Sequence, residues 1–538
     1  MNKKIFAVGT VFESDTLYVA DREVYHIYPS DPLTERDCWW TYLATGGGPL
    51  RAAFVLRGLK NVTVDLGGAK LVFHGRIMPF SVSECENITL RGFSIDYDRP
   101  YYTQGDVLAA GDGYVDIRIP ESFPYRVEGH DFIAMSEFWE HKLCDGDMLF
   151  RCMDPATGRP SNHNHVMLGL IGDEIFPRPN PPLPIAHLLA EDLGNRTVRL
   201  TGLQKNFRPR PGEVLAMTHE DRRKTGIILE ENRDVHIEDI RFLHCSGMGI
   251  MANLCHNITL SGVRMFADAE SRGRVISINA DCFHCFHCTG LMRVEDCRFE
   301  SMLDDGINVH GNYLSFISRE DDNTVLAECR AAALWGMKYY LPGDRVTFYR
   351  GATQEVLFVG TVRSAEYLPG ERKRQRVTFA EAIPASIKEG DCMESEREPE
   401  IEIRRCRVKS TGGFRISSGK RVTVEDCRFE TAYFSILFSG DMHYWFENGP
   451  VKDVTVRNCT FDGCGRCIST ECFFEATEAH PFYHSGLKFE NNTVLNPRGP
   501  MLYLKDMRDV TAKGNRILGA KDGYEPLHLE RCENIVTE

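Results

Sequence analysis

The chain has 538 residues, of which 42% are hydrophobic and 26% are charged, so it can bury a globular core and is not a disordered polyanion or polycation. A formal net charge of −14 argues against a nucleic-acid partner, because there is no basic excess to release counterions from phosphates. No apolar run reaches the ~18 residues that a membrane-spanning helix needs.

The first residues, MNKKIFAVGTVFESD, contain a basic start and a short apolar stretch that soon meets Glu13 and Asp15. This stretch is too short for a secretory signal peptide, so we expect a cytoplasmic protein. The 19 cysteines are scattered along the chain and fit reduced thiols in such a compartment. We leave a homodimer open as the oligomeric state and expect no membrane partner.

A nine-residue pattern recurs along the chain. Apolar and polar residues alternate, then Asp or Asn is followed by Cys or Asn, a polar residue and an apolar one. In chain order, the copies are 61–69, 86–94, 234–242, 257–265, 291–299, 400–408, 421–429, 453–461, 486–494 and 509–517. The alternation has the period of a β-strand, and spacings of about 21–33 residues are typical of a β-solenoid. We therefore predict an all-β fold, a right-handed parallel β-helix.

The pattern is absent from two long stretches, which alternate like antiparallel strands between turns. We predict that both are β-rich, barrel-like insertions. The predicted divisions are N-terminal coils at 1–105, an insertion at 106–225, central coils with the catalytic centre at 226–312, a second insertion at 313–399 and C-terminal coils at 400–538.

Cysteine and asparagine share one position of the pattern. We predict that they form an inward ladder between coils, made of Cys297, Cys406, Cys427, Cys459, Asn492 and Asn515. The spacing of Cys282, Cys285 and Cys288 could also suit a metal, but no second cluster lies nearby, and we favour buried thiols. We therefore predict no metal site and no cofactor.

The segment 279–313 is the richest in reactive side chains. Asp281 and Asp304 lie 23 residues apart, about one coil, so they could stack on one face, and Asp304 and Asp305 are adjacent. Carboxyl groups brought together in this way could supply the acid and base of glycoside hydrolysis, and one of them would keep its proton. The alternative is that Asp-Asp-Gly only forms a turn.

Other polar groups could bind the hydroxyls of an oligosaccharide, which is the substrate class we expect. The candidates are His284, His310, Asn308, His74, Arg76, Asp96, Arg99, Asp441, Trp445 and Glu447. His284 and His310 could instead be buried structural residues, and the cluster at 438–449 could be a packed loop.

Several segments, in this order, resemble glycoside hydrolase family 110, the inverting α-1,3-galactosidases. They are YHIYP (25–29), FHGRIMPF (73–80), SIDYDRPYYTQG (94–105), GMGIMA (247–252), ISINADCFHC (276–285), LDDGINVHG (303–311), PGD (342–344) and GDMHYWFENG (440–449). The resemblance implies a parallel β-helix that carries small barrels. It also implies exo-acting removal of terminal α-1,3-linked galactose with inversion, without a cofactor.

The resemblance places the essential acids on Asp304 and Asp305, a third acid on Asp281 and the histidine that follows it on His284. It does not say which of the adjacent pair is the acid. Cys282 and Cys285 depart from the family pattern, so the fine shape of the pocket is expected to differ from that of the family.

Two alternatives stay open. A polygalacturonase-like hydrolase shares an acid one coil before an Asp-Asp pair but would need basic residues for uronate carboxylates. A non-catalytic carbohydrate-binding β-helix would need no acid pair at all. A lyase is a weaker alternative, because it calls for a calcium-binding acid cluster and a Lys or Arg base.

Overall fold

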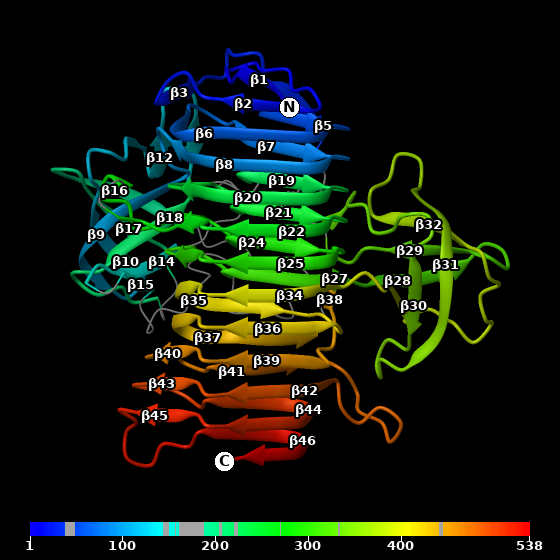
Figure 1. The fold of residues 1–538 in the computed structure, drawn as a ribbon. Coiled ribbons are helices and arrows are strands. Elements are labelled where there is room, and N and C mark those ends of the chain that lie inside the picture. The colour runs from blue at the N-terminus through cyan, green and yellow to red at the C-terminus, as the bar shows by residue number, and fades with distance from the viewer. Residues whose placement is uncertain are drawn as a thin grey trace.

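The computed structural model describes the chain except for residues 38–48, 144–149, 157, 161–187, 204–206, 220–223, 269–270, 332–333 and 441–444. The described parts contain β-strands and no α-helix, as predicted for an all-β protein. The strands stack as successive coils from β1 (Asn2–Ile5) to β46 (Leu527–Thr537), and two insertions project from opposite sides of the stack (Figure 1). No helix in these parts has the length and hydrophobicity to cross a membrane.

One 30-stranded, predominantly parallel sheet forms the coils. Its strands before the first insertion are β1, β2 (Thr16–Val19), β3 (Val24–Ile27), β4 (Thr34–Asp37), β5 (Pro49–Arg57), β6 (Lys60–Phe73), β7 (Met78–Ser83) and β8 (Glu86–Tyr97). Those between the insertions are β19 (Ile227–Glu230), β20 (Arg233–Phe242), β21 (Ile250–Asn253), β22 (His256–Ser261), β23 (Arg264–Met265), β24 (Phe283–Phe286), β25 (Thr289–Glu295), β26 (Arg298–Glu300) and β27 (Ile307–Asn312).

The remaining coils follow the second insertion. Their strands are β34 (Pro399–Arg404), β35 (Arg407–Ile416), β36 (Arg421–Glu425), β37 (Arg428–Gly440), β38 (Glu447–Asn448), β39 (Asp453–Arg457), β40 (Thr460–Asp462), β41 (Ile468–Cys472), β42 (His484–Glu490), β43 (Thr493–Leu495), β44 (Leu502–Lys513), β45 (Arg516–Leu518) and β46. The pairings β4–β5 and β27–β38 are antiparallel.

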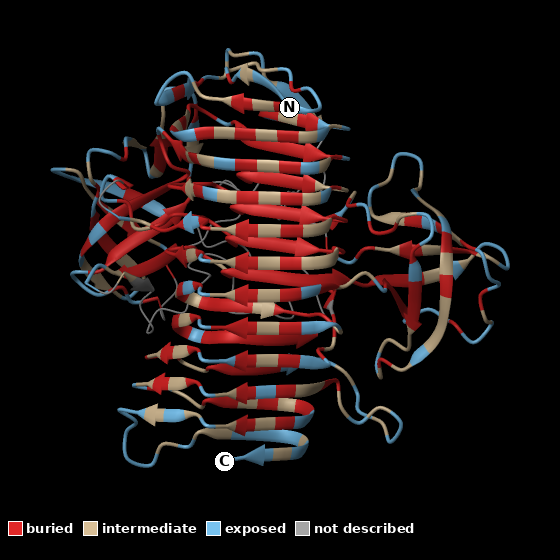
Figure 2. Cartoon of the chain, viewed as in Figure 1, coloured by how far each residue is buried: buried red, intermediate tan, exposed pale blue. Residues whose placement is uncertain are grey.

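The core of the coils is a set of inward ladders, because every second residue of a strand faces the interior. One ladder joins Val62, Ile88, Val235, Ile258, Met292, Ile401, Val422, Val454, Leu487 and Val510 in register, and all are buried. Burying each such side chain contributes about 1.5–3 kcal/mol. Figure 2 shows this buried interior running along the stack.

The predicted ladder of cysteines and asparagines is confirmed at the bend that follows these strands. The Cys406 backbone N–H donates to the Cys427 thiol at 3.4 Å, and the Cys459 N–H donates to Asn492 Oδ1 at 2.9 Å. Asn492 in turn donates its own N–H to Asn515 Oδ1 at 2.9 Å. Thiol and amide side chains therefore cap backbone groups that the bend leaves outside the sheet.

The first insertion lies between β8 and β19. A seven-stranded antiparallel sheet contains β9 (Tyr102–Gly111), β10 (Tyr114–Arg118), β14 (Phe150–Asp154), β15 (Arg159–Pro160), β16 (Leu189–Gly194), β17 (Thr197–Thr201) and β18 (Val214–Thr218). A small sheet contains β11 (Tyr125–Glu128), β12 (Asp131–Met135) and β13 (Glu140–Lys142).

The second insertion lies between β27 and β34 and is a closed barrel. Its strands are β28 (Leu314–Arg319), β29 (Thr324–Glu328), β30 (Arg345–Tyr349), β31 (Val356–Tyr367), β32 (Arg374–Phe379) and β33 (Cys392–Ser395). Among the described strands, closure into a barrel is seen only in this second insertion. The predicted architecture, a β-helix with two β-rich insertions, is confirmed.

Candidate active site

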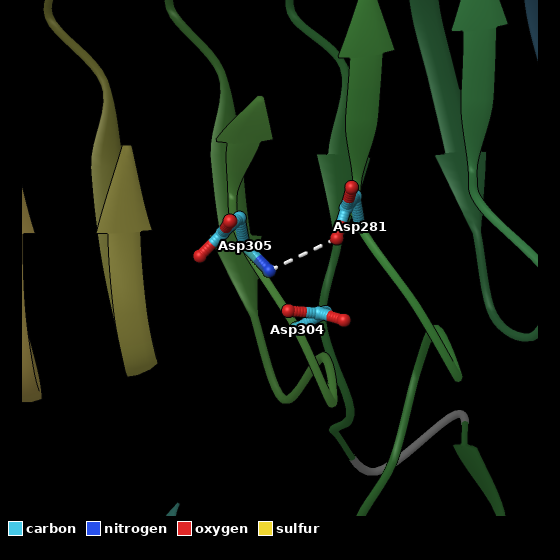
Figure 3. A group of neighbouring side chains, drawn as sticks. All are labelled: Asp281, Asp304 and Asp305. Carbon is cyan, nitrogen blue, oxygen red and sulfur yellow. Dashed lines mark hydrogen bonds between the residues drawn. The ribbon is translucent and has the colours of Figure 1, made fainter. Parts of the chain in front are cut away.

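Three aspartates meet where two neighbouring coils enter their strands (Figure 3). Asp281 precedes β24, and Asp304 and Asp305 precede β27, which pairs with β24 in parallel through Phe283 and Ile307. This register places Asp281 beside Asp305, and the Asp305 N–H donates to Asp281 Oδ1 at 3.1 Å. The coil is thus one residue longer than the expected spacing of Asp281 and Asp304, so the predicted stacking partner was wrong by one position.

The three carboxyl groups are crowded. One oxygen of each lies within 4.8 Å of the others, and Asp281 and Asp305 are buried while Asp304 is partly exposed. Like charges at this spacing oppose ionisation of all three groups. At least one proton is therefore expected to stay on the cluster at neutral pH, as general acid catalysis requires.

Arg415 supplies a positive charge to this cluster. It lies on β35, next to Asn308 of β27 in register, and its Nε is 3.3 Å from Asp305 Oδ2. Burial raises the pKa of Asp305 well above its usual value, Arg415 opposes this, and Asp304, Asp281 and Glu447 add to it. For Arg415, burial works to lower the pKa, but Asp305, Glu447, Glu471 and Asp304 outweigh it and raise the pKa.

Gly412 leaves space for the Asp305 carboxylate. A Cβ atom at this position would lie 2.8 Å from Asp305 Oδ1 and 2.9 Å from Cζ of Phe434. Such distances are far inside van der Waals contact, so a side chain here would push the carboxylate or the ring. Gly412 therefore leaves the room that the carboxylate of Asp305, one coil away, occupies.

His284 and His310 lie directly against the aspartates. His284 is completely buried, with Nδ1 2.5 Å from Asp281 Oδ2 and Nε2 2.7 Å from His310 Nε2. Both of its ring nitrogens therefore face protein groups. Asn308 lies between His284 and Arg415 in the stack, and its buried Oδ1 has no hydrogen-bond partner among the described residues. That oxygen is an acceptor suited to a sugar hydroxyl.

Residues 445–448 lie against the end of β27. Glu447 pairs with Asn312 in the short antiparallel strand β38, and its Oε1 lies 3.5 Å from His310 Nε2. Burial raises the pKa of Glu447, and Arg415 and His284 lower it. Trp445 is half-buried, and its carbonyl accepts from Asn312 Nδ2 at 3.4 Å. Asp441 lies outside the described residues.

Four of the predicted substrate-binding residues, His74, Arg76, Asp96 and Arg99, contact groups other than the three aspartates. Asp96 pairs with Arg274 at 2.8 Å, and Arg99 donates to backbone carbonyls and to Thr103 Oγ1. His74 contacts His26 at 2.9 Å, and Arg76 Nη2 donates to the carbonyl of Glu140 at 3.4 Å.

None of the contacts named above is with the three aspartates, and a substrate-binding role for these four residues stays a prediction. The contact that connects this region with the site is made by the side chain of Asn279 and a backbone carbonyl. Asn279, two residues before Asp281, donates to the carbonyl of Tyr101 at 3.2 Å. This segment thus supports the chain that leads into the cluster.

Sequence reasoning missed Arg415 and Gly412. Both lie in the segment TGGFRISSG (411–419), where an arginine follows two glycines and a phenylalanine near the end of β35. A single charged residue among glycines and apolar residues was the signal in the sequence that could have pointed to Arg415. It was hidden because the second insertion separates Arg415 by 110 positions from Asp305.

Within the described ranges, Asp281, Asp304 and Asp305 are the one group of His, Cys, Asp or Glu side chains close enough to share a cation. Arg415 already pairs with one of these carboxyls and His284 with another, an arrangement that suits acid–base chemistry, and we do not assign them as metal ligands. Cys282, Cys285 and Cys288 are buried free thiols and form no such group.

Two family models match the chain. A model described as "Right handed beta helix region" matches residues 392–535, and one described as "GLAA-B beta-barrel domain I" matches residues 103–215, within the first insertion. The first match fits the handedness predicted for the coils. The second assigns the first insertion to a barrel domain.

Known proteins match most of the chain. "Alpha-1,3-galactosidase B" of Bacteroides thetaiotaomicron is 27% identical over 511 residues, covering 91% of this chain and 79% of that one. "Alpha-1,3-galactosidase B" of Phocaeicola vulgatus is 32% identical over 429 residues, covering 77% of this chain and 67% of that one.

Among solved structures, a polygalacturonase from Erwinia carotovora is 8% identical with a TM-score of 0.34, covering 98% of this chain and 90% of that one. A similarity at this level does not bear on the reaction. The relatives at 27% and 32% identity do. This chain belongs to their family, the alpha-1,3-galactosidases of glycoside hydrolase family 110.

Proposed function

We propose that this protein hydrolyses terminal α-1,3-linked galactose from oligosaccharides, as an exo-acting glycosidase that inverts the anomeric centre. The observation that carries the proposal is the convergence of Asp281, Asp304 and Asp305 in a member of this family. Glycoside hydrolysis needs one carboxylic acid and one carboxylate around the scissile bond, and this cluster contains both. The scheme uses no metal ion and no organic cofactor.

Exposure separates the roles of the three acids. The general acid must reach the leaving oxygen, which points toward the rest of the oligosaccharide and solvent. Asp304 is the partly exposed member and suits this role. Asp281 and Asp305 are buried and adjacent, and we assign them to hold and deprotonate the attacking water. Arg415, whose Nε lies 3.3 Å from Asp305 Oδ2, favours the ionised form of Asp305 that a base needs.

The distance between the carboxyl groups bears on whether the reaction inverts or retains the anomeric configuration. Inverting enzymes commonly separate the two carboxyl groups by about 6.5–9.5 Å, and retaining enzymes by about 5–5.5 Å. Here the closest oxygens lie within 4.8 Å, which favours the retaining alternative on spacing alone. We keep inversion because the chain belongs to the family in which the reaction is inverting, and because two stacked carboxylates can hold one water between them.

Proton NMR of a reaction on an aryl α-galactoside and on a Gal-α-1,3-Gal disaccharide tests the proposal. We expect β-galactose as the first product, whereas α-galactose released first would establish retention. Asp304→Asn and Asp305→Asn should each lower kcat by about 10²–10⁴-fold. Asp322→Asn is the matched control, because Asp321 and Asp322 form another adjacent pair in an exposed turn of the barrel insertion. Unchanged turnover in both site variants would contradict the proposal.

Two alternatives predict different results in the same assay. A polygalacturonase-like enzyme would cleave uronate polymers, but the cation found beside the aspartates, Arg415, is already paired with Asp305. A non-catalytic sugar-binding protein would show no turnover and would keep its affinity in Asp304→Asn.

A further inference from the structure

A chain of hydrogen bonds leads from Asp281 into the interior of the protein. Asp281 Oδ2 lies 2.5 Å from His284 Nδ1, and His284 Nε2 lies 2.7 Å from His310 Nε2. The far nitrogen of the second ring, His310 Nδ1, lies 2.8 Å from the carbonyl oxygen of Gly311. All three side chains are at least 96% buried.

The carbonyl at the end of the chain fixes the positions of the protons. Gly311 O only accepts, so His310 Nδ1 must carry a hydrogen. A single hydrogen must then lie between the Nε2 atoms of His284 and His310. Two hydrogens between these atoms would clash, and with no hydrogen between them their two lone pairs would face and repel each other. A third hydrogen must lie between His284 Nδ1 and Asp281. Two neutral imidazoles carry only two ring hydrogens, so the trio holds one additional proton.

From this count we propose that His284 is an imidazolium that keeps Asp281 ionised, and that it is a positioning residue of the active site whose own proton is fixed by His310. The inference rests on the proposed function only for its effect on catalysis. Free imidazole binds a proton more tightly than a free carboxylate, with pKa values of about 6.5 and 3.9. The Asp305 N–H that donates to Asp281 Oδ1 also stabilises the carboxylate form.

Burial lowers the pKa of His310, and the neighbouring His284 lowers it further. The additional proton therefore rests on His284 and not on the second ring. The other charged or titratable groups that face this trio are Asp304, Asp305, Glu447, Arg415, His287 and Cys282. The His284 imidazolium and the Arg415 guanidinium offset part of the negative charge of these carboxyl groups, which lowers the cost of burying Asp281 and Asp305 together.

Nitrogen-15 NMR of the full chain, labelled at histidine, tests the protonation state without measuring turnover. At pH 8, where a free imidazole with a pKa of about 6.5 is almost wholly neutral, we expect both nitrogens of His284 to carry hydrogen. His284→Gln assigns the signal by its loss.

His287 is the internal control for this measurement. It is buried in the same coil, accepts the Asn312 N–H at Nε2 and faces Asn253 Oδ1 through Nδ1, and burial lowers its pKa to about 3. It should therefore appear neutral. A neutral His284 with one bare nitrogen at pH 8 would overturn the inference, whatever the enzyme's activity.

The pH profile of kcat/KM provides the second readout. Loss of the imidazolium in His284→Gln should raise the pKa of Asp281, so the acidic limb should move to higher pH and activity should fall most at low pH. His287→Gln should leave the position of that limb unchanged. An acidic limb that stays in place in His284→Gln, while overall activity falls, would show a structural role only and would contradict the inference.

Discussion

At the scale of single residues, Gly412 is the most sensitive neighbour of the catalytic cluster. Gly412→Ala would place a methyl group 2.8 Å from Asp305 Oδ1 and 2.9 Å from Phe434. Displacing a catalytic group by about 1 Å can reduce the rate about 10²-fold, and we expect a loss of that size in kcat/KM.

Gly360→Ala is the matched control for this change. Its Cβ would meet the rings of Phe379 and Phe358 at 2.8 and 3.0 Å in the barrel, with no carboxylate nearby. Thermal unfolding measures the steric effect that both variants share, and steady-state kinetics measures the effect that belongs to the site. Equal activity losses in the two variants would show that Gly412 has no special relation to Asp305.

Arg415 is expected to set the pH dependence through Asp305. Arg415→Gln removes the cation that opposes the raised pKa of Asp305, so that pKa should rise further. If Asp305 is part of the base, the acidic limb of kcat/KM moves to higher pH. If Asp305 is instead the acid, the basic limb moves to higher pH, and our assignment of Asp304 as acid is wrong. Arg415→Lys should restore part of the shift.

The free energy of unfolding of Arg415→Gln should change with pH in a defined direction. The pKa of Asp305 in the folded state lies above the unfolded value of about 3.9, so its contribution is complete below that pH and is lost as pH rises through the folded pKa. The deficit of Arg415→Gln in free energy of unfolding should therefore grow from pH 4 to pH 8. Arg421→Gln removes an exposed ion pair with Glu400 and should change stability by less than about 1 kcal/mol at either pH.

At the scale of elements, the ladder of cysteines and asparagines at the bend allows us to rank the stability losses of substitutions within it. Asn492 is completely buried, accepts the Cys459 N–H and donates to the carbonyl of Val456 at 3.0 Å. Asn492→Ala leaves both groups unpaired, and we expect a loss of about 2–3 kcal/mol in chemical denaturation.

Substitutions at the same ladder position give the comparison. Cys427 offers only a weak thiol acceptor to the Cys406 N–H at 3.4 Å, so Cys427→Ala should cost less than Asn492→Ala. Asn492→Cys introduces the residue found at this position in neighbouring coils. Its loss in free energy of unfolding should lie between the losses for Cys427→Ala and Asn492→Ala. A larger loss for Cys427→Ala would show that packing, and not hydrogen bonding, dominates the ladder.

The strands, the ladder and the acidic cluster could be predicted from the sequence because each has a local signal: alternation, a repeated position, or adjacent aspartates. The pairing of Asp281 with Asp305 could not. Coil length varies with the bends between strands, and a change of one residue there selects a different neighbour. Arg415 could not be identified from the sequence for a related reason: the barrel insertion separates it along the chain from its partner Asp305.

At the scale of the whole molecule, the first insertion contacts the coils next to the active site. Arg151 of β14 donates from Nη1 to Thr411 Oγ1, and β15 contacts β35. Thr411 directly precedes Gly412, the residue that leaves room for Asp305. The insertion and the catalytic coil are therefore joined at a point where a small backbone shift would reach the acid.

Arg151→Met should reveal this coupling, because it keeps the length and the apolar stem of the side chain but removes the donor. We expect kcat/KM to fall by between about 10-fold and 100-fold, through a shift at Thr411 and Gly412 that moves Asp305. Arg199→Met is the control, since Arg199 pairs with Asp116 at 2.7 Å entirely within the insertion. If both variants lose the same small amount of activity and of thermal stability, the insertion is only a neighbour of the site. A loss confined to Arg151→Met would show that the insertion helps to hold the catalytic coil in place.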